Sequence, residues 1–227
     1  MRRFILPLIF GIVGTAILMS LGTWQVRRLQ WKEAILAEID ARIIAAPIAL
    51  PVDPDPVKDR FLPVEATGTI TQDEVHVLVS VKKVGPGYRI ISAFETEGRR
   101  ILLDRGFIFT PDKDVKRPAV QATIAGNLHW PEEIDSYPPD NDLKNNIWFS
   151  RDVDTMAKAL KTEPVLLIAR TTSEKNPPVS PLPVDSAGIP NDHLQYVVTW
   201  YGLAAVWVIM TLYYMWRQRA PKEGKET

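Results

Sequence analysis

The chain has 227 residues, and its 27 lysines and arginines are balanced by 27 aspartates and glutamates. The length leaves room for one domain of ordinary size, and the balanced charge gives no electrostatic reason to expect a nucleic-acid partner. Cysteine is absent, which excludes disulfides, thiolate metal sites, thiol nucleophiles and thioredoxin-like redox chemistry.

The N-terminal segment is apolar. Residues 4–21 carry no charge and follow two arginines, an order that a cleaved signal peptide also shows. The apolar run is longer than the usual ~7–15 residues of a signal peptide, and no A-x-A cleavage site follows it. We therefore expect an uncleaved transmembrane helix. Apolar residues then recur at three- or four-residue steps, so the first predicted segment, residues 1–43, includes an amphipathic extension of this helix.

Proline-rich stretches at residues 44–60 and 173–192 predict two linkers around an external β-rich domain, residues 61–172. The domain alternates in hydrophobicity and is rich in β-branched residues. The predicted strands are residues 62–70, 74–81, 88–94, 100–107, 123–128 and 165–169, and the predicted helix is 152–160. The order predicts an α+β fold, in which an antiparallel β-sheet or small β-barrel with one helix lies between two transmembrane helices.

A second apolar segment predicts the other transmembrane helix, residues 193–217. No charge occurs from Val197 to Trp216, and about 20 residues at 1.5 Å each span the roughly 30 Å of a bilayer core. A basic tail, residues 218–227, follows it. The basic residues after the helix are Arg217, Arg219, Lys222 and Lys225.

The basic tail predicts that both termini are cytoplasmic and that the domain lies on the outer side of the membrane. The basic residues after the first apolar run, Arg27, Arg28 and Lys32, argue for the opposite orientation. Long loops translocate largely regardless of their charge, so we base the predicted orientation on the basic residues of the tail.

The three histidines show no metal-site spacing, and the chain lacks GxSxG, Walker and GxGxxG motifs. His76 and His129, in or beside predicted strands, are expected to face solvent. The neighbours Asp104 and Arg105 predict an ion pair or a turn contact. His193 differs because it lies one turn outside a membrane helix, where a histidine can ligate haem iron or titrate near neutral pH.

Aromatic residues accompany His193 on the second apolar helix. Tyr196, Trp200 and Trp207 fall on broadly the same face, and Gln195 is adjacent to the same helix end. An interfacial aromatic belt does not account for Trp200 and Trp207, which lie deeper than the membrane surface. Their partner could be the other helix, a protein or a flat macrocycle.

Three motifs resemble the Surfeit locus protein one family: LGTWQVRRLQWK after the first apolar run, GYRIISAF followed by ILLDRGF in the domain, and PNDHLQYVVTWYGLA at the second helix. The resemblance covers nearly the whole chain. It implies a bacterial factor that assists assembly of haem-copper terminal oxidases, notably cytochrome c oxidase, and that binds haem a or helps its insertion into subunit I.

The resemblance also assigns roles to single residues. His193 becomes the candidate axial ligand of the haem iron, and Tyr196 and Trp200 could line the ring. Trp24, Gln25 and Arg28 become possible pocket or propionate contacts, since arginine suits carboxylates.

No catalytic residue is implied by the resemblance. Its implied partners are oxidase subunit I, other assembly factors and the lipid bilayer, and its implied location is the bacterial inner membrane with a periplasmic domain. Two alternatives stay open: a cofactor-free scaffold for oxidase subunits, and a membrane-anchored external enzyme that would depend on Asp104, Arg105 and His129.

Overall fold

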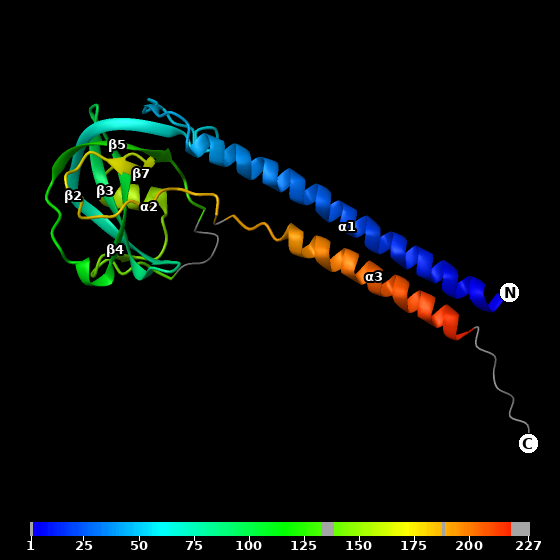
Figure 1. The fold of residues 1–227 in the computed structure, drawn as a ribbon. Helices are drawn as coiled ribbons and strands as arrows, with labels where there is room; N and C mark the ends of the chain where they lie inside the picture. Colours follow the sequence, from blue (N-terminus) through cyan, green and yellow to red (C-terminus); the bar gives the residue numbers. More distant parts are fainter. Residues whose placement is uncertain (1, 133–138, 188, 219–227) are drawn as a thin grey trace, which may run out of the picture. The chain divides into compact units, whose positions relative to one another are not determined.

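The computed structural model describes residues 2–132, 139–187 and 189–218. The chain forms two compact units, one of residues 1–38 with 187–227 and the other of residues 39–186. Figure 1 colours the chain from blue to red along the sequence. The basic residues Arg219, Lys222 and Lys225, on which the predicted orientation depends, lie outside the described residues.

In the described residues, the first unit contains two helices, α1 (Arg2–Ile43) and α3 (His193–Arg217). Residues 39–43, the end of α1, belong to the second unit. α1 continues from the apolar run through the amphipathic extension without a break, as predicted. Both helices are long and apolar enough to cross a membrane. Only 11% and 6% of their most apolar windows are buried in the protein, whereas the core helix of a soluble protein is mostly buried.

In the part of the second unit that the structure describes, a seven-stranded mixed sheet packs with one short helix (Figure 1). Its strands are β1 (Ile48–Ala49), β2 (Pro63–Val81), β3 (Gly85–Thr96), β4 (Arg99–Phe109), β5 (Val120–Leu128), β6 (Ile147–Trp148) and β7 (Leu166–Thr172). A 3₁₀ turn, η1 (Thr110–Asp112), follows β4.

The expected purely antiparallel order is wrong, because three strands pair in parallel. β1 and β6 run parallel to β2, and β7 runs parallel to β4. β5 returns to pair with the first half of β2, so the sheet curls strongly. We describe it as a curled mixed sheet and not as a closed barrel.

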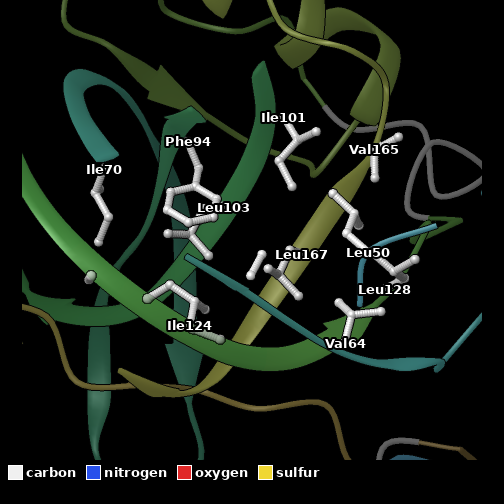
Figure 2. Close-up of a cluster of buried hydrophobic side chains, with 13 residues drawn as sticks. Leu50, Val64, Ile70, Phe94, Ile101, Leu103, Ile124, Leu128, Val165 and Leu167 are labelled. Carbon is white, nitrogen blue, oxygen red and sulfur yellow. The ribbon is translucent and has the colours of Figure 1, made fainter. Parts of the chain in front are cut away.

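The concave side of the sheet encloses the larger apolar core. Figure 2 shows side chains from several strands converging there, among them Ile70, Phe94, Leu103, Ile124 and Leu167. These five residues are at most 1% exposed. Their contacts join strands far apart in the sequence, so burial of this cluster stabilises the whole sheet.

A second core lies under α2 (Val153–Leu160), which the sequence predicted. Asp152 caps the helix, and its carboxylate accepts hydrogen bonds from the backbone N–H groups of Asp154 and Thr155. Met156 and Leu160 face the sheet and are buried.

Residues of both proline-rich stretches also contact the sheet. β1 and the buried Leu50 come from the first stretch. In the second, Val179 packs in a small apolar cluster and Ser180 exchanges backbone hydrogen bonds with Phe107. These contacts fix both stretches to the domain over part of their length.

A candidate cofactor site on the helix pair

Small residues bring α1 and α3 into close contact. A side chain added at Gly11 would collide with Thr211, and one added at Gly14 would collide with the indole of Trp207. Gly22 faces the ring of Tyr201 in the same way. Close approach at small residues is the usual packing of membrane helices. Along these contacts the residue numbers rise on α1 while they fall on α3, so the two helices are antiparallel.

The antiparallel packing places His193 beside Gln25. The Nδ1 atom of His193 lies 2.9 Å from Oε1 of Gln25. An amide oxygen can only accept a hydrogen bond, so Nδ1 is the donor in this contact. In a neutral imidazole with the hydrogen on Nδ1, the lone pair is on Nε2. Gln25 is 7% exposed and is therefore held firmly against the neighbouring helix.

This arrangement suits a histidine that ligates a metal. Metal-binding histidines usually donate their second ring N–H to an acceptor, which fixes the ring and its tautomer. Within residues 2–132, 139–187 and 189–218, Nε2 of His193 makes no hydrogen bond. No cluster of three His, Cys, Asp or Glu side chains that could hold a metal ion occurs in the described part of the chain. Haem iron needs no such cluster, since its porphyrin supplies the other donors.

The remaining predicted site residues lie on the same helix pair, and among the described residues none of them makes a side-chain hydrogen bond with His193. Trp24 and Tyr196 are 56% and 51% exposed, and Gln195 is also exposed. Trp200 is half-buried. The guanidinium of Arg28 lies 4.0 Å from the centre of the Trp31 ring on its own helix, in a cation–π contact.

Trp24 and Tyr196 nevertheless share one flank of the pair. Residues seven apart lie on nearly the same side of a helix. Two such steps separate Trp24 from Phe10 on α1, and two separate Tyr196 from Met210 on α3. Phe10 and Met210 line one groove of about 680 Å³ between the helices. The predicted aromatic residues therefore lie on the flank that carries this groove.

One of the predictions about the β domain is wrong. His76 is 7% exposed and not solvated, because Arg117 and the loop before it cover it. Its Nε2 lies 2.9 Å from Oε1 of Glu74. Asp104 and Arg105 each form an ion pair, as predicted, but with other residues and not with each other.

Asp104 is fully buried and pairs with Arg89, with Arg151 3.8 Å away. Arg105 pairs with Glu174 at 2.8 Å. Burial lowers the pKa of Arg105, although the charge of Glu174 acts in the opposite direction. These side chains are held within the fold as partners of other charges, so the site on the helix pair is the stronger candidate.

His129 is half-buried, and its ring stacks on Phe61 with centroids 5.0 Å apart.

Sequence reasoning missed the glycines at 11, 14 and 22 of α1 and the role of Arg117. The spacing of small residues along an apolar helix was the available signal for the glycines.

The chain is similar to a set of known proteins over nearly its full length. The model of the SURF1 family matches residues 12–205. Surfeit locus protein 1 of Rattus norvegicus is 30% identical over 212 residues, covering 82% of this chain and 68% of that protein. The SURF1-like protein of Rickettsia bellii is 31% identical over 227 residues, covering 95% of this chain and 92% of that protein. The family match includes both Gln25 and His193.

Proposed function

The chain belongs to the SURF1 family, and from this premise we propose that it assists assembly of a haem-copper terminal oxidase, cytochrome c oxidase, by holding haem a on its helix pair for insertion into subunit I. The observation that carries this proposal is the hydrogen bond between Nδ1 of His193 and Gln25, which leaves Nε2 in the form that binds iron. Haem a would supply the redox-active iron of the oxidase.

Each residue has a definite task in this proposal. Nε2 of His193 would bind the haem iron, and Gln25 would hold the imidazole ring in its tautomer. Tyr196 and Trp200 would face the porphyrin ring with Trp24 on the same flank. Arg28 would leave Trp31 to bind a haem propionate, and Gln195 would contribute a polar contact at the helix end.

The two helices would cross the bacterial inner membrane, with both termini in the cytoplasm and the β domain in the periplasm. Other oxidase assembly factors would be further partners. In this role the protein carries a cofactor and catalyses no reaction.

The test is a haem spectrum of the full chain, purified in detergent from cells that make haem a. We expect the wild-type protein to carry haem and His193→Ala to lose it. Gln25→Leu should weaken haem binding by about tenfold to a hundredfold, the usual effect of removing such a supporting hydrogen bond. His129→Ala, which removes a histidine stacked on Phe61 in the other unit, is the matched control and should keep its haem. Absence of haem from the wild-type protein would refute the cofactor role.

A cofactor-free scaffold is the second candidate. It is favoured by the exposed apolar side chains along both helices, which could pack against helices of oxidase subunits. Co-purification with subunit I should then be the same in cells that lack haem a. The haem-carrier proposal expects this association to fall when haem a is depleted.

A further inference from the structure

A second polar contact joins α1 and α3 close to the pair of His193 and Gln25. The hydroxyl oxygen of Tyr201 lies 3.2 Å from Oγ1 of Thr23, two residues before Gln25 on α1. Thr23 already donates its own hydroxyl hydrogen to the carbonyl oxygen of Met19, at 2.8 Å. A hydroxyl group has a single hydrogen, so the Tyr201 hydroxyl is the donor and Thr23 is the acceptor in this contact.

Gly22 allows the Tyr201 ring to reach Thr23. A Cβ atom added at Gly22 would lie 2.9 Å from Cε1 of that ring, closer than ordinary van der Waals contact. Gly22 and Gln25 are three residues apart on α1, and both are buried. The tyrosine ring therefore packs on the backbone of α1 within one helical turn of the partner of His193.

Hydrogen bonds specify the register of two packed helices more sharply than apolar contacts do. The contacts at Gly11 and Gly14 require only a small residue opposite a larger one. A slip of one residue moves a side chain by about 1.5 Å along the helix, which is enough to break a directional hydrogen bond. The bonds of Tyr201 to Thr23 and of His193 to Gln25 therefore form together, in a single register of α1 and α3.

We propose that Tyr201 is a positioning residue for His193 and acts through its hydrogen bond to Thr23. By holding the two helices in this register, it keeps Gln25 opposite Nδ1 and so keeps the hydrogen of the neutral ring on that atom. The hydrogen bond of one ring nitrogen sets the tautomer of a histidine. The inference rests on the proposed function in one respect, that this tautomer serves to leave Nε2 for a ligand.

A role in packing alone predicts a different result, because the Tyr201 ring fills the space over Gly22 with or without its hydroxyl group. Tyr201→Phe keeps the ring and removes the donor. Thr23→Val removes the acceptor, and Thr23→Ser retains it. Tyr213→Phe is the matched control, since it removes a hydroxyl group from a 58% exposed tyrosine of the same helix, whose ring lies 6.1 Å from that of Trp216.

The readout is the tautomer of His193 in full-length apoprotein, in detergent and without haem. The chain has 3 histidines, so isotopic labelling of the histidine nitrogens gives few signals in nuclear magnetic resonance, and His193→Ala identifies those of His193. The chemical shifts of the neutral ring report which nitrogen carries the hydrogen. Gln25→Leu gives the ratio of the two tautomers without the amide partner.

We expect the wild-type ring to carry its hydrogen on Nδ1. In Tyr201→Phe and in Thr23→Val, the ratio of the Nδ1–H to the Nε2–H tautomer should fall about threefold, the effect of an average hydrogen bond between membrane helices. The double variant should show no further fall, since both changes remove the same bond. Thr23→Ser and Tyr213→Phe should keep the wild-type ratio.

An unchanged ratio in Tyr201→Phe would overturn the inference, as would a wild-type ring with its hydrogen on Nε2. An equal fall in Tyr213→Phe would also overturn it, because it would indicate a general loosening of the helix pair. Additive falls in the double variant would show that the two hydroxyl groups act separately, against the inference. Failure of the proposed function is distinguishable, because a protein that binds no haem still shows the expected tautomer ratios.

Discussion

Glu74→Gln should destabilise the β domain far more than its position near the surface of the sheet suggests. The Glu74 carboxylate accepts hydrogen bonds from Nε and Nη2 of Arg117, at distances of 2.7–3.1 Å. It also lies 2.9 Å from Nε2 of His76. The substitution keeps the shape of the side chain and removes its charge.

The expected loss follows from the burial of the partner. The side chains of Arg117 and Glu74 are 2% and 13% exposed. Removing one member of a buried pair leaves the other charge without compensation, which typically lowers the free energy of unfolding by about 3–5 kcal/mol. The other hydrogen bonds of Arg117, to the carbonyl oxygens of Asp112 and Lys113, remain but do not neutralise it.

The control is a pair of the same chemistry at the surface. Arg99 binds Glu163 through Nε and Nη2, but their side chains are 18% and 41% exposed. Glu163→Gln should therefore lower the free energy of unfolding by less than about 1 kcal/mol. Both variants are measured in the full chain in detergent. Unfolding by urea is followed by the circular dichroism signal of the β-sheet. Equal losses in the two variants would refute the argument from burial.

The pH dependence gives a second check on Glu74. Burial raises its pKa, but the hydrogen bonds from His76 and Arg117 outweigh burial and hold the pKa below its ordinary value of 4.5. The ionised carboxylate therefore stabilises the fold above the unfolded pKa, and this contribution is lost as the pH falls through the lower folded pKa. The loss of unfolding free energy in Glu74→Gln should have its full size at pH 7 and should shrink below about pH 4.5. A loss of unfolding free energy that did not change with pH would contradict the stabilising role of the ionised Glu74 carboxylate.

Three further substitutions test other parts of the structure. Met156→Ala removes a fully buried side chain under α2 and should lower the free energy of unfolding by about 2–5 kcal/mol in urea titrations. Asp152→Ala removes the cap of α2 and should cost about 1 kcal/mol in the same assay. Gly14→Val should push Trp207 away from α1 and lower haem occupancy in purified protein, whereas Gly202→Ala, where an added Cβ has no neighbour within 4 Å, should leave it unchanged.

Local patterns were sufficient to predict α1, α3, α2 and most strands. The α2 prediction succeeded because its cap and its apolar face are set by neighbouring residues, Asp152, Met156 and Leu160. β1 and β6 were missed because two residues are too short to show an alternating pattern. The parallel pairing of β7 with β4 depends on the path of the chain between them, which periodicity does not specify.

Burial of polar residues was the harder problem. The alternation of β2 correctly placed His76 on the face of Glu74, but Arg117, which covers it, lies 41 positions away in the chain. The same limit applies to the candidate site. Resemblance singled out Gln25 and His193 separately, whereas their hydrogen bond joins residues 168 positions apart and depends on helix packing.

The separation of the two units bears on how the protein would work. Gln25 and His193 lie in the helix unit, and their alignment depends on glycine contacts of that unit alone. The buried charges of the β domain are paired with one another, as Arg117 is with Glu74 and Arg105 with Glu174. A charge that already pairs with a buried partner is poorly suited to bind a haem propionate, because its release would leave that partner buried and unpaired. The helix pair is therefore the place to look for the ligand.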